Sequence, residues 1–104
     1  MKVQVNTDSN IEGREEMTQQ VEAALRAAVG RFTDQITRVE VHLSDLNSHK
    51  FGPADKRSLH EARLAGRQPT AVSHQAGTIQ EAIEGAAEKL KSSLESTLGR
   101  QGRG

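Results

Sequence analysis

The chain has no cysteine, tryptophan or tyrosine, and its 104 residues include two phenylalanines and two prolines. The absence of cysteine excludes disulfide bonds and thiolate chemistry, and it fits a reducing compartment. The scarcity of aromatic residues leaves few platforms on which nucleic-acid bases could stack. The core must be built from Val, Ile, Leu and Ala, and we therefore expect it to be thin.

The sequence also lacks a net charge and long apolar runs. Lysine plus arginine and aspartate plus glutamate number 14 each, so the large positive charge of many nucleic-acid-binding proteins is missing. Binding of an anion must then depend on local clusters of cationic side chains. No segment of the sequence approaches the roughly 20 apolar residues of a membrane span, and the amino terminus has no signal-peptide hydrophobic region. We expect a cytoplasmic protein that does not contact a membrane.

The length is that of one small domain. Regular hydrophobic patterns extend to about residue 98, whereas the last residues are rich in glycine and have no periodicity. We predict a single domain over residues 1–98 and a flexible tail over residues 99–104.

Two segments have the apolar spacing of amphipathic helices. The first begins at about Arg14 and reaches Phe32, with acidic residues in its first turn and basic residues near its end. The second, Thr78 to Leu98, opens with Thr78 and Glu81 at the spacing of a capping box. The two apolar stripes are formed by Met17, Val21, Ala24, Leu25, Ala28 and Phe32, and by Ile79, Ile83, Ala86, Leu90, Leu94 and Leu98.

Four segments alternate between apolar and polar residues, as strands with one covered face do. The clearest places Val39, Val41 and Leu43 on the inner face. Between the second and third strands, residues 47–56 include glycine and proline and predict a long mobile loop. The predicted strands are Lys2 to Asn6, Ile36 to Leu46, Ser58 to Ala65 and Thr70 to Gln75.

The order of these elements restricts the topology. A helix between the first two strands makes them a parallel pair, whereas the later short connections favour antiparallel neighbours. Both helices must cover the same face of the sheet because one set of alternate strand positions is apolar. The sequence predicts an α+β two-layer sandwich of β-α-β-β-β-α order, with a four-stranded mixed sheet.

Two stretches carry a resemblance to a known family. They are ITRVEVHLSD, Ile36 to Asp45, and AIEGAAEKLKSSLESTL, Ala82 to Leu98, in which Ala82 and Ile83 precede the Lys89–Leu90 step and Leu94. In these stretches and in element order over residues 1–98, the chain resembles the ribosome hibernation-promoting factors, which include the ribosome-associated inhibitor A proteins. The resemblance implies a fold similar to double-stranded-RNA-binding domains. It also implies a non-enzymatic factor that binds the small-subunit decoding channel and blocks messenger and transfer RNA during slow growth.

The chain departs from this family at several positions. The family is usually basic one and two turns after the lysine matched by Lys89, but these positions are Ser92 and Ser96 here. An aromatic residue near the start of that helix is replaced by Ile79 and Gln80. The part of the loop around Lys50 to Lys56 and the stretch Glu61 to Pro69 are also unlike the best-known members. The chain therefore represents a divergent branch.

RNA is bound chiefly through its phosphates, so several cationic side chains must converge on one surface. The residues predicted to do so, along the edge where the two helices meet, are Arg26, Arg31, Lys89, Lys91 and Arg100. The alternative is that these are solvated positions that pair with Glu22, Glu88 and Glu95. For Arg38 and Arg63 on the open sheet face, we expect cross-strand pairing with Glu40 and Glu61 instead.

The four histidines raise the alternative of a metal site, since imidazole is a common ligand. Strand parity places His42 on the open face and His60 on the covered face, which leaves His60 and His74 as the pair to test. Because parity separates these histidines, we predict no metal site. We also predict no cofactor and no enzymatic activity, since the sequence has no thiol, no Gly-rich phosphate loop and no nucleophile elbow.

The predicted function is that of a ribosome-associated translation regulator that binds small-subunit ribosomal RNA from the helix side. The alternative is a protein-interaction module that forms a homodimer or docks a partner through the open sheet face. Leu59, which points outward by parity, is the residue that favours this alternative.

Overall fold

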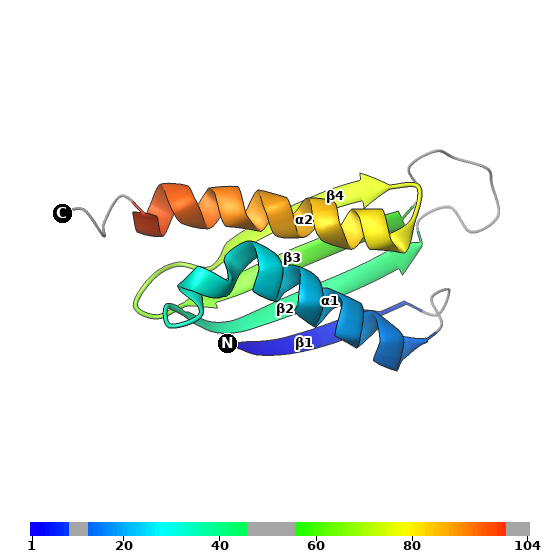
Figure 1. The fold of residues 1–104 in the computed structure, drawn as a ribbon, viewed down its shortest axis with the longest axis horizontal. Helices are drawn as coiled ribbons and strands as arrows, with labels where there is room; N and C mark the ends of the chain where they lie inside the picture. The colour runs from blue at the N-terminus through cyan, green and yellow to red at the C-terminus, as the bar shows by residue number, and fades with distance from the viewer. Residues whose placement is uncertain (9–12, 46–55, 100–104) are drawn as a thin grey trace.

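The computed structural model describes residues 1–8, 13–45 and 56–99. They form two layers, a four-stranded sheet and two helices that lie side by side across one of its faces (Figure 1). This is the predicted α+β sandwich, and the predicted order is confirmed. The elements are β1 (Lys2–Thr7), α1 (Arg14–Val29), a 3-10 turn (Gly30–Phe32), β2 (Ile36–Asp45), β3 (Lys56–Leu64), β4 (Thr70–Ala76), α2 (Ile79–Leu94) and a π-helical C-terminal segment (Glu95–Gly99).

The sheet has the strand order β1-β2-β3-β4. β1 and β2 are parallel, as a strand-helix-strand connection requires, and the other two pairs are antiparallel. β3 begins two residues earlier than predicted, at Lys56, and pairs there with Asp45. The rest of the predicted loop at residues 47–56 lies outside the described residues.

The core is aliphatic, as the composition predicts. Val39, Val41 and Leu43 of β2 are buried, and Phe32 is the one aromatic side chain among the buried described residues. In α1 the residues that face the sheet are Val21, Leu25 and Val29, all fully buried. The sequence stripe missed Val29 and included Ala24 and Ala28, which are half-buried because they face α2.

Both helices change their winding at the C-terminal end. α1 ends as an α-helix at Val29 and tightens into the 3-10 turn, which buries the Phe32 ring. α2 ends as an α-helix at Leu94 and widens into the C-terminal segment. Helical structure therefore extends to Leu98, the predicted end of this helix. The helices lie parallel, with both C-terminal ends at one end of the molecule (Figure 1).

The predicted capping box at Thr78 and Glu81 is confirmed. The backbone N–H of Glu81 donates to Oγ1 of Thr78 at 3.1 Å, and the Thr78 hydroxyl donates to Oε1 of Glu81 at 3.0 Å. The cap therefore satisfies one of the backbone donors that a helix leaves free at its start.

Replacement of Thr78 by Ala is expected to lower the free energy of unfolding by about 1 kcal/mol, because it removes this acceptor. Urea denaturation followed by circular dichroism measures the change. Ser92→Ala is the matched control, since Ser92 is exposed within α2, where alanine favours the helix by a few tenths of a kcal/mol. Equal midpoints for the two variants would contradict a stabilising cap.

Candidate nucleic-acid interface

The seam between α1 and α2 is lined by small side chains. Ala24 and Ala27 of α1 and Glu84 of α2 are shared by two hollows of about 270 Å³ each. Small residues let two helices approach closely, and the two hollows lie along this line of contact. Because Glu84 and Glu88 line these hollows, the middle of the seam is acidic.

Arg31 and Lys91 lie at the C-terminal end of this seam, which we call the seam end. Nη1 of Arg31 lies 3.8 Å from Oε2 of Glu95, and its guanidinium stacks 4.6 Å from the centre of the Phe32 ring. Lys91 follows the seam residue Ala87 by one helical turn and therefore faces α1. Within the described part of the chain, Lys91 forms no ion pair.

Arg26 and Lys89 lie on opposite outer flanks of the helical layer. Arg26 shares a face with Glu22, 3.6 Å away, and this face lies outside the alanine seam of α1. Nζ of Lys89 donates a hydrogen bond of 2.9 Å to the backbone carbonyl of Ser73 in β4. The structure thus brings Arg31 and Lys91 to the seam and places Arg26 and Lys89 away from it. Arg100 lies outside the described residues.

Helical geometry explains this division. Lys89 and Lys91 are two residues apart, and two steps of an α-helix rotate a side chain by about 200°. One lysine therefore faces β4 while the other faces α1. Lys89 also covers a carbonyl on the outer edge of the sheet, which reduces the tendency of β4 to pair with another strand.

The ion pairs of Arg26 and Arg31 are weak enough to exchange for phosphate contacts. The Arg26 side chain is 76% exposed and that of Arg31 is 64% exposed, with nitrogen-to-oxygen distances near the limit of an ion pair. Exposed pairs of this kind contribute about 0.3–0.5 kcal/mol. Their partners Glu22 and Glu95 are among those that the alternative hypothesis named.

On the open sheet face, the prediction of cross-strand ion pairs is wrong. The register places Arg38 opposite Arg63 and Glu40 opposite Glu61, so that like charges face each other across the sheet. The ion pairs run along the strands instead, at 3.1 Å for Arg38–Glu40 and 3.7 Å for Arg63–Glu61. The buried face fixes the register, and residues two apart on one strand remain neighbours on the open face.

Leu59 lies on the open face, as parity predicts, and is half-buried. Its neighbours across the sheet are His42 on β2 and Ser73 on β4, both polar. Among the described residues of this face, Leu59 is therefore an isolated large apolar side chain, which differs from the contiguous apolar patch of a typical interaction surface.

The histidines occupy the predicted faces. His42 is exposed on the open face, whereas His60 is fully buried beneath the helices. Nε2 of His60 lies 2.7 Å from Oγ of Ser58, while Nδ1 has no hydrogen-bond partner within the described ranges. Burial lowers the pKa of His60 to about 4. In the same ranges, no three His, Cys, Asp or Glu side chains converge as a metal site would require.

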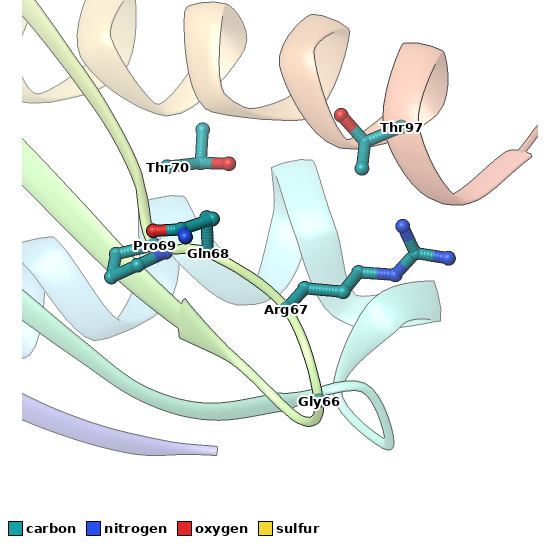
Figure 2. Close-up of a pocket in the computed structure, with 6 residues that line it drawn as sticks. All are labelled: Gly66, Arg67, Gln68, Pro69, Thr70 and Thr97. Carbon is teal, nitrogen blue, oxygen red and sulfur yellow. The ribbon is translucent and has the colours of Figure 1, made fainter.

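A larger hollow lies where the β3–β4 turn meets the C-terminal segment (Figure 2). Its volume is about 830 Å³, and its lining combines polar and apolar groups. Gly66, with φ of +70°, turns the chain and is followed by Arg67, whose side chain extends toward Thr97 (Figure 2). Sequence reasoning assigned this stretch to a turn and missed the hollow, because Thr97 is distant in sequence. The lining residues are Gly66, Arg67, Gln68, Pro69, Thr70 and Thr97.

Within the described residues, neither helix has the combined length and apolarity needed to cross a lipid bilayer.

Comparisons with known proteins relate this chain to one protein family and to solved structures of the same fold. The family model described as Sigma 54 modulation protein / S30EA ribosomal protein matches residues 3–101. No curated protein matches the sequence. The N-terminal domain of Protein Y from Thermus thermophilus has a TM-score of 0.74 at 21% identity, with 93% of this chain and 99% of that chain covered. A ribosomal subunit interface protein from Coxiella burnetii has a TM-score of 0.76 at 12% identity, with 95% and 99% covered. These two likenesses establish the fold.

Proposed function

Because this chain belongs to the Sigma 54 modulation protein / S30EA ribosomal protein family, we propose that it is a non-enzymatic factor that associates with the ribosome and regulates translation. The finer part of the proposal is that it binds ribosomal RNA of the small subunit, as hibernation factors do, through cationic residues of its helix side. The name of the Coxiella burnetii protein, a ribosomal subunit interface protein, supports a ribosomal partner.

The single observation that carries the RNA contact is the position of Arg31 and Lys91 at the seam end. Arg31 from the turn after α1 and Lys91 from α2 both lie there, beyond the acidic middle of the seam at Glu84 and Glu88. Lysine and arginine bind phosphates and release counterions, so a pair of this kind contributes affinity at low salt. Arg26 and Lys89 extend the contact on the two flanks, where each must first leave its partner. We propose that Arg100 also contacts RNA phosphate.

The proposal is tested by cosedimentation with small ribosomal subunits at low and high salt. The Arg31→Gln/Lys91→Gln variant is expected to bind about tenfold more weakly at low salt. The slope of log affinity against log salt concentration is expected to fall by the contribution of about two phosphate contacts. The loss stays modest because the Arg31 contact to phosphate replaces its pair with Glu95.

A matched control removes the same charge from the other side of the sheet. Lys2→Gln/Arg57→Gln changes two cations that form no ion pair in the described part of the chain, both on the open face. It is expected to bind as the natural protein does. Equal weakening by both double variants would show that overall charge, and not the seam end, determines affinity. Failure of the natural chain to sediment with subunits even at low salt would refute the ribosomal function.

Self-association through the open sheet face is the alternative function, and Leu59 is the observation in its favour. Stable homodimers bury extensive apolar surface, and the polar neighbours His42 and Ser73 limit what this face can offer. Light scattering on the same samples distinguishes the two functions. A tight dimer that does not sediment with ribosomes would support self-association in place of the ribosomal function.

A further inference from the structure

The hollow at the β3–β4 turn has the composition of an anion site. Its polar lining residues present one guanidinium, the amide of Gln68 and the hydroxyls of Thr70 and Thr97 (Figure 2). None of the six lining residues is acidic. A surface that offers hydrogen-bond donors and no carboxylate favours a ligand whose atoms are acceptors, such as a phosphate.

Arg67 differs from the arginines of the helix side in having no ion-pair partner among the described residues. Arg26 and Arg31 each lie beside a glutamate, whereas Arg67 forms no ion pair within residues 1–8, 13–45 and 56–99. Its side chain is partly buried against the hollow. Partial burial strengthens a charge-assisted hydrogen bond relative to a fully solvated one, and the planar guanidinium can donate to two oxygens of one phosphate.

The hollow lies close in the fold to the seam end. Glu95, which holds Arg31, and Thr97, which lines the hollow, are two residues apart in the C-terminal segment. Side chains two residues apart on a helical segment point to nearly opposite sides. Arg31 and Arg67 therefore flank this segment. A helix is about 10–12 Å across with its side chains, and a nucleic-acid strand covers that span in roughly three or four nucleotides.

From these observations we propose that the hollow at the β3–β4 turn binds a backbone phosphate of an RNA strand that crosses the C-terminal segment. The inference rests on the proposed function for the identity of the strand. Arg67 makes the charged contact, while Thr97 and Thr70 donate hydroxyl hydrogen bonds to the phosphate oxygens. A hollow of about 830 Å³ is larger than an isolated phosphate needs, and it accommodates the adjoining sugar and base.

The first arm of the test uses inorganic phosphate alone and does not require ribosomes. Amide chemical shifts of the full chain are followed by NMR as sodium phosphate replaces sodium chloride at constant ionic strength. Residues Gln68, Thr70 and Thr97 are expected to shift in the natural protein and to remain unchanged in Arg67→Gln. Absence of any shift at these residues would refute an anion site, whatever the outcome with ribosomes.

The second arm measures binding of a short single-stranded oligoribonucleotide by fluorescence anisotropy at low salt. Arg67→Gln is expected to weaken binding about tenfold, because it removes a charged contact for which no carboxylate of the described residues competes. Arg57→Gln is the matched control. Arg57 also lacks an ion pair among the described residues, and it lies at the opposite end of β3, on the open face.

The two arms separate the sources of the phosphate. Thr97→Val removes the hydroxyl and keeps the shape of the side chain, and it is expected to weaken RNA binding a few-fold. Because this variant changes no charge, such a loss would support the site independently of Arg67. If inorganic phosphate shifts the hollow while Arg67→Gln and Arg57→Gln bind RNA equally, the hollow takes free phosphate and the assignment to an RNA strand is overturned. If ribosome binding fails while both arms succeed, the site stands and the ribosomal function falls.

Discussion

Acidification from pH 7 to pH 4 is expected to lower the free energy of unfolding by about 3 kcal/mol through His60 alone. His60 is fully buried on the helix side of β3, between Val41 of β2 and Val72 of β4. Its one hydrogen-bond neighbour is Ser58, and Nδ1 is without a partner in the described residues. A proton on this ring would leave a charge in an apolar layer, so burial lowers the pKa.

The direction of the pH effect follows from the two pKa values. In the unfolded chain His60 takes up a proton as the pH falls through 6.5, whereas in the folded protein it resists protonation until about pH 4. The stabilisation is therefore complete above pH 6.5 and is lost progressively between pH 6.5 and 4. At about 1.4 kcal/mol per pH unit, this interval corresponds to about 3 kcal/mol.

Denaturant titrations at pH 7 and pH 5 test this prediction. Ser58→Ala/His60→Leu removes both members of the hydrogen-bonded pair and leaves no unpaired buried hydroxyl. Between these pH values, the natural protein is expected to lose about 2 kcal/mol more than this variant. His42→Gln, at the exposed histidine on the open face, is expected to retain the natural pH dependence. Equal losses in all three proteins would refute a buried neutral His60.

Gly85 and His74 are expected to show a coupling energy of about 2–3 kcal/mol in a double-mutant cycle. Gly85 lies in α2 where the helix passes over β4, and a methyl group there would lie 2.1 Å from Cδ2 of His74. Glycine to alanine in a helix otherwise stabilises by about 1 kcal/mol. Overpacking costs about 1–3 kcal/mol and is severe at this distance, so the clash outweighs the helix propensity.

The cycle compares Gly85→Ala in two backgrounds by chemical denaturation. Gly85→Ala alone is expected to destabilise by about 1–2 kcal/mol, whereas in a His74→Ala background the same change stabilises by about 1 kcal/mol. Gly30→Ala is the control, since Gly30 has a right-handed backbone and open space around its Cβ position. Additive effects at Gly85 and His74 would mean that the helix and β4 are not in tight contact.

Much of the fold follows from local patterns in the sequence. The step of three or four residues through Ile83, Leu90 and Leu94 predicts α2, and alternation at Val39, Val41 and Leu43 predicts β2; all are buried as expected. The cap at Thr78 was predictable for the same reason, because its partner is three residues away. The resemblance in Ala82–Leu98 also predicts the family that the match over residues 3–101 establishes.

The arrangement of charges required the tertiary structure. The cross-strand pairs predicted for Arg38 and Arg63 failed because the sequence gives the face of each side chain but not the register between strands. That Lys89 and Lys91 point to different sides of α2 follows from their spacing in the sequence. The hydrogen bond from Lys89 to Ser73, however, depends on how α2 lies over β4.

Local patterns along the chain suffice to set the elements, their order and their buried faces, because these depend on periodicities of a few residues. The tertiary structure, in contrast, sets which distant polar groups become neighbours: Arg31 pairs with Glu95, and Arg67 and Thr97 line the same hollow. These residues are distant in the chain, and their proximity results from the packing of two layers. Electrostatic contacts act over a few ångströms, so they are set after packing has fixed the distances.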